Sequence, residues 1–241
     1  MQSALPGEKT IKAVFFDAAG TLIKPVRPVG ESYAAIAAPY GLKVSAAQIN
    51  DRFRACFAAA PPLAFPGVPL AGIEVLERNW WKELVRKIFQ PWSPFDDFDQ
   101  YFDELFAYFA QTRSWSLYPE VLDILAVLKG RGLILDVVSN FDSRLITILN
   151  GLGAGPWFEE IFISSRVGYA KPDPGIFAAA LAFHGLNPEN AAHVGDDQQN
   201  DLHGAANAGL KAILVERGEP NSIPSPTCVS NLSGVLEVLD D

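Results

Sequence analysis

Short runs of apolar residues recur along the chain, and each is bounded by Gly, Pro, Asn or Asp. They are rich in Val, Ile and Phe and are apolar on both faces. Such runs are typical of buried strands in a parallel sheet. The five runs are AVFFD (13–17), LILDVVS (133–139), EIFIS (160–164), AHVGD (192–196) and AILVE (212–216).

Helical patterns separate these runs. Apolar residues recur with helical spacing over 121–128, and Gly130 lies at the end of that pattern. Asp142 is expected to cap a helix in SRLITILNGLG. Asp173 followed by Pro174 is the expected N-cap and first turn of a helix in GIFAAALAFHG. The alternation of strands and helices predicts an α/β fold, a doubly wound parallel sheet covered by helices.

One long region, from about Val26 to Thr112, contains helical patterns and no convincing strand. Ser45 and Gln48 form a capping box at the start of one of its helices. Aromatic residues between 95 and 109 recur at helical spacing, which predicts the core of a helix bundle. The expected organisation is a core domain interrupted by an all-helical insert, with boundaries at 1–24 (core), 25–114 (insert) and 115–241 (core).

Composition and charge narrow the classes of function. The 241 residues are 49% hydrophobic, so the chain is long and apolar enough for a sizeable core. The net charge of -9 argues against a nucleic-acid surface or an anionic membrane as partner. Two cysteines, no apolar leader and no run of about 18 apolar residues lead us to expect a cytoplasmic protein with reduced thiols. Oligomeric state is left open.

Polar residues stand where the predicted strands end. Asp17 ends the first run, Ser139 and Asn140 the second, and Asp196 the fourth, while Lys171 follows the third. The carboxyl ends of parallel strands meet at one edge of the sheet, where ligands bind. Any one of these residues alone would be read as a helix cap or a surface charge. Together at one edge they predict a site.

The residue types at this edge suit phosphoryl transfer. A carboxylate, Asp17, can attack phosphorus and form an acyl-phosphate. Mg²⁺ takes a few oxygen ligands, which Asp17, Asp196 and the backbone carbonyl of Ala19 can supply. Lys171 and the Ser139 hydroxyl are expected to hold phosphate oxygens, together with backbone N–H groups at the helix start after Asn140. The expected partner is a small phosphorylated substrate.

Four stretches, FFDAAGTL, VVSN, KPDP and HVGDDQQND, resemble in order the four motifs of the haloacid dehalogenase superfamily. The helical insert resembles the subfamily I cap of that superfamily. RPVGESYAAIAAPYGLKV, the Trp80–Trp81 pair, SNFDSRL and AAHVGDD resemble the group named for the rhythmically expressed gene two protein. The resemblance implies a magnesium-dependent hydrolase with a Rossmann-like core and an inserted cap domain.

The resemblance also implies a role for each matching position. The nucleophile is Asp17, and Lys171, Ser139 and Thr21 complete the catalytic set. Phosphate binding falls to Ala18, Ser139, Asn140 and Lys171. The magnesium ligands are Asp17, the Ala19 carbonyl, Asp196 and Asp201.

Of the histidines, His193 is expected to be packed within a strand and His184 to be exposed at a helix end.

One position departs from the family pattern. Phosphatases of the superfamily carry a second Asp two residues after the nucleophile, which acts as general acid and base, and here that residue is Ala19. General acid–base catalysis contributes about 10²–10⁴-fold in rate. Hydrolysis of a phosphorus–carbon bond through a Schiff-base lysine, hydrolysis of a carbon–halogen bond, and an inactive binding protein therefore remain alternatives. Asp196 and Asp201 disfavour dehalogenation, because dehalogenases lack these metal-binding acids.

Overall fold

A computed structural model of the chain describes residues 11–92, 95, 97–218 and 227–240. The core is a six-stranded, all-parallel sheet with strand order β5-β4-β1-β6-β7-β8. The five predicted strands are all present, so the predicted fold is confirmed. A sixth strand of two residues was not predicted, because it is too short to form a pattern. The strands are β1 (Ala13–Phe16), β4 (Ile134–Ser139), β5 (Ile161–Ile163), β6 (Ala191–Gly195), β7 (Lys211–Val215) and β8 (Cys228–Val229).

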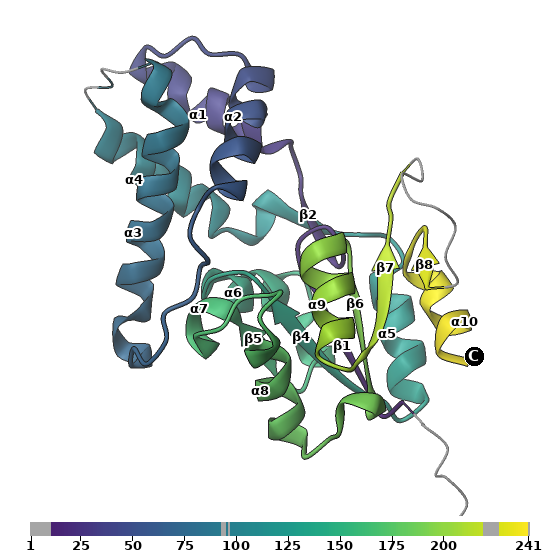
Figure 1. Cartoon of the computed structure of the whole chain (residues 1–241). Coiled ribbons are helices and arrows are strands. Elements are labelled where there is room, and N and C mark those ends of the chain that lie inside the picture. Colours follow the sequence, from purple (N-terminus) through teal and green to yellow (C-terminus); the bar gives the residue numbers. More distant parts are fainter. Residues whose placement is uncertain (1–10, 93–94, 96, 219–226, 241) are drawn as a thin grey trace, which may run out of the picture.

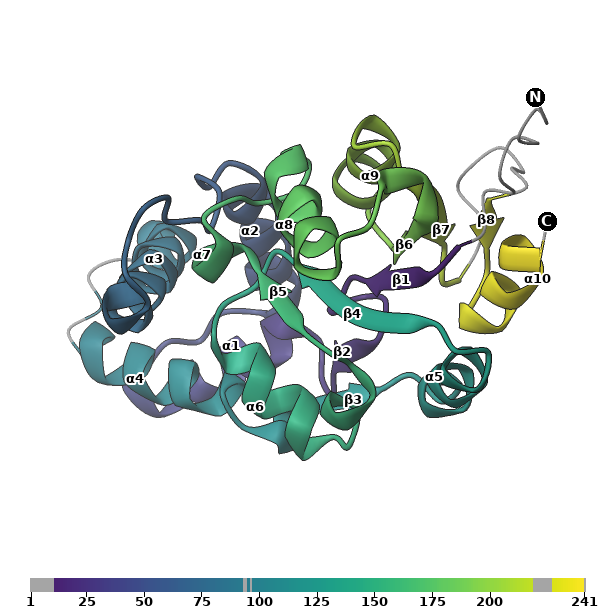
Figure 2. The same ribbon diagram turned by 90° about the horizontal axis from the view of Figure 1, so that it is seen from below.

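Each face of the sheet is covered by helices, as Figure 2 shows. Alternate residues of β1 point to opposite faces, so that Val14 and Phe16 join one apolar cluster and Ala13 and Phe15 the other. This explains why the run AVFF is apolar throughout. The first face packs against α5 (Val121–Gly130), α6 (Arg144–Gly151) and α10 (Val235–Asp240), and the second against α8 (Pro174–His184) and α9 (Gly204–Asn207).

Two of the three predicted helix starts are confirmed. Asp173 is the N-cap of α8, and its carboxylate accepts a hydrogen bond from the backbone N–H of Gly175 at 2.7 Å. The capping box of Ser45 and Gln48 is also present, at the start of α2. Asp142 is not the N-cap of α6, since that position is Ser143. Its carboxylate still accepts from the backbone N–H of Arg144 at 3.0 Å.

The insert forms a separate helical cap, which lies on the side of the sheet where β1 leads into β2 (Figure 1). Its core is a cluster of buried aromatic and aliphatic side chains centred on Tyr33, Phe89 and Tyr101. An antiparallel ribbon of β2 (Ile23–Pro25) and β3 (Trp115–Leu117) joins cap and core. The cap helices are α1 (Val29–Ala37), α2 (Ala46–Ala58), α3 (Leu70–Phe89) and α4 (Phe98–Phe109).

Two polar side chains of α3, Glu77 and Trp81, hold the cap against the core. Glu77 is 2% exposed, and its Oε1 accepts from the backbone N–H of Ser143 at 3.0 Å and from the Ser165 hydroxyl at 2.6 Å. The indole N–H of Trp81 donates to Asp142 at 2.6 Å. Ser143 and Asp142 lie at the start of α6, close behind the end of β4. The cap is therefore fixed next to the edge of the sheet where the strands end.

Replacing Glu77 with Ala should destabilise the protein by about 1–3 kcal/mol, because several donors lose their buried acceptor at once. The free energy of unfolding in urea measures this loss. Glu74→Ala is the matched control, since Glu74 lies one turn earlier on α3 and is exposed. Equal stabilities of the two variants would show that Glu77 does not hold the cap.

The part of the chain that the structure describes contains no helix both long enough and apolar enough to cross a membrane.

Candidate active site

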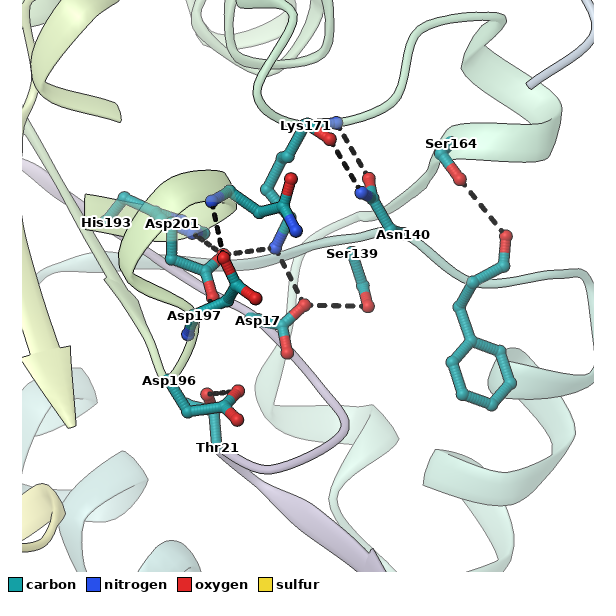
Figure 3. Close-up of polar contacts among 12 residues, drawn as sticks. Asp17, Thr21, Ser139, Asn140, Ser164, Lys171, His193, Asp196, Asp197 and Asp201 are labelled. Atoms are coloured by element: carbon teal, nitrogen blue, oxygen red, sulfur yellow. Dashed lines mark hydrogen bonds and ion pairs between the residues drawn. The ribbon is translucent and has the colours of Figure 1, made fainter. Parts of the chain in front are cut away.

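Asp17 is the centre of the site, immediately after β1. It is 8% exposed, and its Oδ1 accepts a hydrogen bond from the Ser139 hydroxyl, at the end of β4, at 2.9 Å. The same oxygen pairs with the ammonium of Lys171 at 2.7 Å (Figure 3). The chain runs to β4 and β5 on one side of β1 and to β6 and β7 on the other, so β1 lies at the topological switch point. The predicted convergence of strand ends is present.

Lys171 lies in the loop between α7 (Ser164–Val167) and α8 and is held from two directions. Its ammonium bridges Asp17 and Asp201, at 2.7 and 2.6 Å. Its backbone is fixed by the side-chain amide of Asn140, which accepts from the Lys171 N–H at 2.7 Å and donates to the Lys171 carbonyl at 2.8 Å. The Asn140 side chain therefore positions Lys171. Phosphate binding by Asn140 stays a prediction.

Two of the backbone N–H groups at the helix start after Asn140, where phosphate was expected to bind, already have partners within the chain. The N–H of Ser143 donates to Glu77, and the N–H of Arg144 donates to Asp142. These two groups are therefore occupied by the cap and by the adjacent carboxylate, and phosphate binding by the N–H groups nearer to Asn140 stays a prediction.

Asp196 follows β6 and faces the turn after β1. The Thr21 hydroxyl donates to its Oδ1 at 3.2 Å, so Thr21 orients this carboxylate; a further catalytic role for Thr21 stays a prediction. Gly20 has a φ of 97°, and a Cβ at this position would lie 2.2 Å from Asp196 Oδ2. Glycine is required here both by the left-handed backbone and by the close approach of the carboxylate.

Asp201 is buried on a short π-helix, Gln198–His203. Its Oδ1 accepts from Lys171 and from Nε2 of His193 at 2.9 Å, and its Oδ2 accepts from the backbone N–H of Asp197 at 2.9 Å. Burial lowers the pKa of His193, so its ring is neutral and carries its proton on Nε2. His193 is packed within β6 and hydrogen-bonded, as expected.

Three carboxylates and one ammonium give the site a net negative charge when all three acids are ionised. Asp17, Asp196 and Asp201 each place one carboxylate oxygen within 4.8 Å of the others. Partial desolvation within the acidic cluster, together with the charges of Asp17 and Asp201, raises the pKa of Asp196 to about 7, although part of this residue is exposed to solvent. Burial raises the pKa of Asp17 as well, although Lys171 opposes it. Burial lowers the pKa of Lys171, but the two carboxylates outweigh burial, raise that pKa and keep the side chain cationic.

This arrangement fits a divalent cation. Hard oxygen donors gathered at one point repel each other, and a cation of charge two relieves that repulsion. The absence of a side chain at Gly20 leaves room for the Asp196 carboxylate beside the turn after β1. The donor set thus contains the carboxylates that were predicted to bind metal, and Ala19 lies on the same turn.

Residues 11–209 match the haloacid dehalogenase-like hydrolases, and the match spans four strands of the sheet (β1, β4, β5 and β6), the cap and the whole acidic cluster. The chain belongs to this family. The hydrolase is 35% identical over 244 residues to haloacid dehalogenase-like hydrolase domain-containing protein 3 of Mus musculus, covering 95% of this chain and 94% of the relative. Over 113 residues it is 42% identical to the phosphoserine phosphatase of Thermus thermophilus, covering 46% and 45% of the two chains.

Solved structures of other proteins share this fold. A putative family hydrolase of Bacillus subtilis bound to magnesium superposes with a TM-score of 0.74 at 16% identity, covering 96% of this chain and all of that one. Both phosphatases and dehalogenases occur among structures with this fold. The fold alone therefore does not distinguish the two reactions.

Ala19 is the position where this hydrolase departs from the phosphatase pattern. Its side chain is exposed, and it lines a cavity of about 610 Å³ between core and cap. Glu31 and Tyr33, which follow soon after the first motif, do not line this cavity in the structure: Glu31 is exposed on α1 and Tyr33 is buried among the cap aromatics. The described lining residues include no carboxylate from the cap.

Arg217 is a component of the site that sequence reasoning did not identify. It follows β7, and its guanidinium donates to the carbonyls of Gly20 at 3.1 Å and Thr21 at 2.7 Å. It also pairs with Glu120 at 2.8 Å and stacks over the Tyr118 ring. Arg217 thereby fixes the turn that carries Ala19. A cation directly after a strand, at the same edge as the acids, was the signal available in the sequence.

Proposed function

We propose that this hydrolase is a magnesium-dependent phosphatase that acts on a small phosphorylated molecule through an aspartyl-phosphate on Asp17. The observation that carries the proposal is the environment of this carboxylate. Ser139 and Lys171 both contact Oδ1, which fixes the plane of the carboxylate where it lines the cavity between core and cap. A buried, oriented carboxylate beside a fixed ammonium is suited to attack an anionic phosphate.

The proposed reaction has two steps. A carboxylate oxygen of Asp17 forms a bond to phosphorus while the bond between phosphorus and the ester oxygen breaks, and the alcohol oxygen leaves with that electron pair. Water then attacks the phosphorus of the acyl-phosphate, which releases inorganic phosphate and restores Asp17. Lys171 offsets the charge on the phosphate oxygens in both steps, and Ser139 keeps the carboxylate aligned.

Magnesium, held by Asp17, Asp196 and the carbonyl of Ala19 with support from Asp201, would supply the positive charge that lets two anions meet. The carboxylate cluster supports this assignment, and so does the magnesium bound to the Bacillus subtilis structure with the same fold. The chain's own contribution is to hold these carboxylates in place through Thr21 and Lys171.

Replacing Asp196 with Asn should weaken magnesium binding at least about tenfold, measured by calorimetry. Because the pKa of Asp196 is about 7, the carboxyl carries a proton below that pH and a metal must displace it. Wild-type affinity should therefore fall between pH 8 and pH 6, and this pH dependence should diminish in Asp196→Asn. Asp197→Asn is the matched control, since Asp197 caps the π-helix and Asn preserves a cap. Equal losses in both variants would place the metal elsewhere.

The direct test is release of inorganic phosphate from a panel of phosphate esters, with magnesium and with a chelator. We expect turnover that the chelator abolishes. Turnover that persists in the chelator would refute the magnesium requirement. Failure to hydrolyse any of the esters would refute the proposed phosphatase activity.

Two alternative hydrolytic reactions lack support among the described cavity residues. The Schiff-base route to phosphorus–carbon cleavage needs a lysine from the cap, and the described lining includes Lys171 of the core and no cap lysine. A haloacid carries a carboxylate but no group that would need a divalent cation, whereas three aspartates gather around the single ammonium of Lys171 and fit such a cation. Ala19 favours one further candidate, a binding protein without turnover. Thermal stabilisation by phosphometabolites that are not hydrolysed would support it.

A further inference from the structure

The cavity above Asp17 has two chemically different walls. The core wall carries the acids and Lys171, whereas the cap contributes apolar groups from the end of α2, the following loop and α3. The described cap residues on this wall are Phe57, Ala58, Ala60, Pro61, Pro62, Leu63, Trp80 and Trp81.

The cap wall presents ring surfaces and not hydrogen-bond donors. The indole N–H of Trp80 donates to the Pro61 carbonyl at 3.0 Å, and that of Trp81 to Asp142 at 2.6 Å. The ring of Phe57 lies 6.0 Å from that of Trp80, and the two indoles pack edge to face at 5.0 Å. Phe57 is nevertheless 44% exposed. The large aromatic side chain of Phe57 is thus exposed on the wall of the cavity, and the neighbouring indole N–H groups already have hydrogen-bond acceptors.

The charges of the cavity disfavour a second anionic group on the substrate. Lys171 is the one cation among its described lining residues, and it is buried between Asp17 and Asp201. The other charged lining residues are aspartates. A carboxylate or second phosphate on the substrate would face this negative edge, or an apolar wall, without a partner.

We propose that the substrates are phosphate esters of uncharged, planar aromatic alcohols, with the ring against Phe57 and Trp80 and the phosphate on Asp17. The inference rests on the proposed phosphatase function and names its substrate class. This substrate class is consistent with Ala19 at the position of the usual general acid. A phenolate leaves without a proton from the enzyme far more readily than an alkoxide does. The phosphoryl group passes to Asp17, the aryl oxygen leaves with the bonding pair, and solvent protonates it.

The expected preference for a substrate without a second negative charge is tested with two substrates of equal shape, 4-carbamoylphenyl phosphate and 4-carboxyphenyl phosphate. We expect kcat/KM for the neutral amide to be higher by at least about tenfold, because like charges placed together are costly. The Ala58→Lys variant adds a cation to the cap wall, where the end of α2 favours one, and should raise kcat/KM for the carboxylate alone. Equal values for the two substrates in the wild type would overturn the inference.

Ring recognition is tested with 1-naphthyl phosphate and acetyl phosphate, an activated compound without a ring. Phe57→Ala should raise KM for the naphthyl ester about two- to tenfold and change KM for acetyl phosphate much less. Phe57→Leu, which keeps an apolar side chain, should show the same selectivity if Ala disturbs folding. Val75→Ala is the control, since Val75 is 63% exposed on α3 and does not line the cavity. Equal effects of Phe57→Leu on both compounds would refute ring recognition.

Acetyl phosphate also separates a failure of the aromatic substrate class from a failure of the phosphatase function. Its hydrolysis in the presence of magnesium, with no preference for neutral aryl esters, would overturn the aromatic substrate class and leave the phosphatase standing. Failure to hydrolyse acetyl phosphate and every aryl ester would overturn both.

Discussion

Asp17→Asn is expected to lower phosphate release by at least about 10³-fold while the protein stays folded. An amide is a poor nucleophile towards phosphorus, so no acyl-phosphate should form. The fold should persist because Lys171 keeps its contact with Asp201 at 2.6 Å when the charge of Asp17 is lost. Initial rates with magnesium saturating measure the loss, and circular dichroism measures the fold. Mass spectrometry after acid quenching should detect a phosphorylated peptide around Asp17 in the wild type alone.

Ser139→Ala is the matched comparison for this experiment. It removes one hydrogen bond to the same oxygen, Oδ1 of Asp17, and keeps the carboxylate. We expect a smaller loss in kcat, of about tenfold, and a phosphopeptide that still forms. Asp17→Asn with activity near that of Ser139→Ala would mean that Asp17 is not the nucleophile.

The core and its acidic edge were predictable because they depend on local pattern and topology. The run AVFF is apolar because both faces of β1 are covered, which is also why it is recognisable in the sequence. Asp17, Ser139 and Asp196 are far apart in sequence but meet because parallel strands bring their carboxyl ends to one edge. Once the strands are identified, their convergence follows without knowledge of any side-chain contact.

Contacts between distant segments were not predictable in this way. Arg217 reaches Gly20 across 197 positions, and Glu77 of the cap reaches Ser165 across 88. His184 was expected to be exposed, and this was wrong: its Nε2 lies 2.6 Å from a carboxylate oxygen of Asp136, buried in β4. Each contact depends on how elements pack in three dimensions, and the residues themselves would suit a solvated surface equally well.

Ala19→Asp is expected to accelerate hydrolysis of alkyl phosphates by about 10²–10⁴-fold and that of aryl phosphates much less. Ala19 lines the cavity beside Asp17, where a carboxyl could protonate a leaving oxygen. Among the described residues, positive φ angles are confined to glycines, so the backbone at position 19 accepts an Asp. The neighbouring acids should raise the pKa of the new carboxyl and keep it protonated near neutral pH.

Ala19→Asn is the control that separates proton transfer from shape, because its side chain has the same size and transfers no proton. The ratio of alkyl to aryl turnover, measured at several pH values with magnesium saturating, should rise in Ala19→Asp alone. A wild type that already hydrolyses alkyl phosphates as fast as aryl phosphates would show that another group is the acid. Asp197 would then be the first residue to replace, because it lines the cavity, whereas Glu31 and Tyr33 do not. An Ala19→Asp variant that folds, binds magnesium and gains on no ester would mean that proton transfer does not limit the reaction. The step that limits it would then lie in formation or hydrolysis of the acyl-phosphate on Asp17.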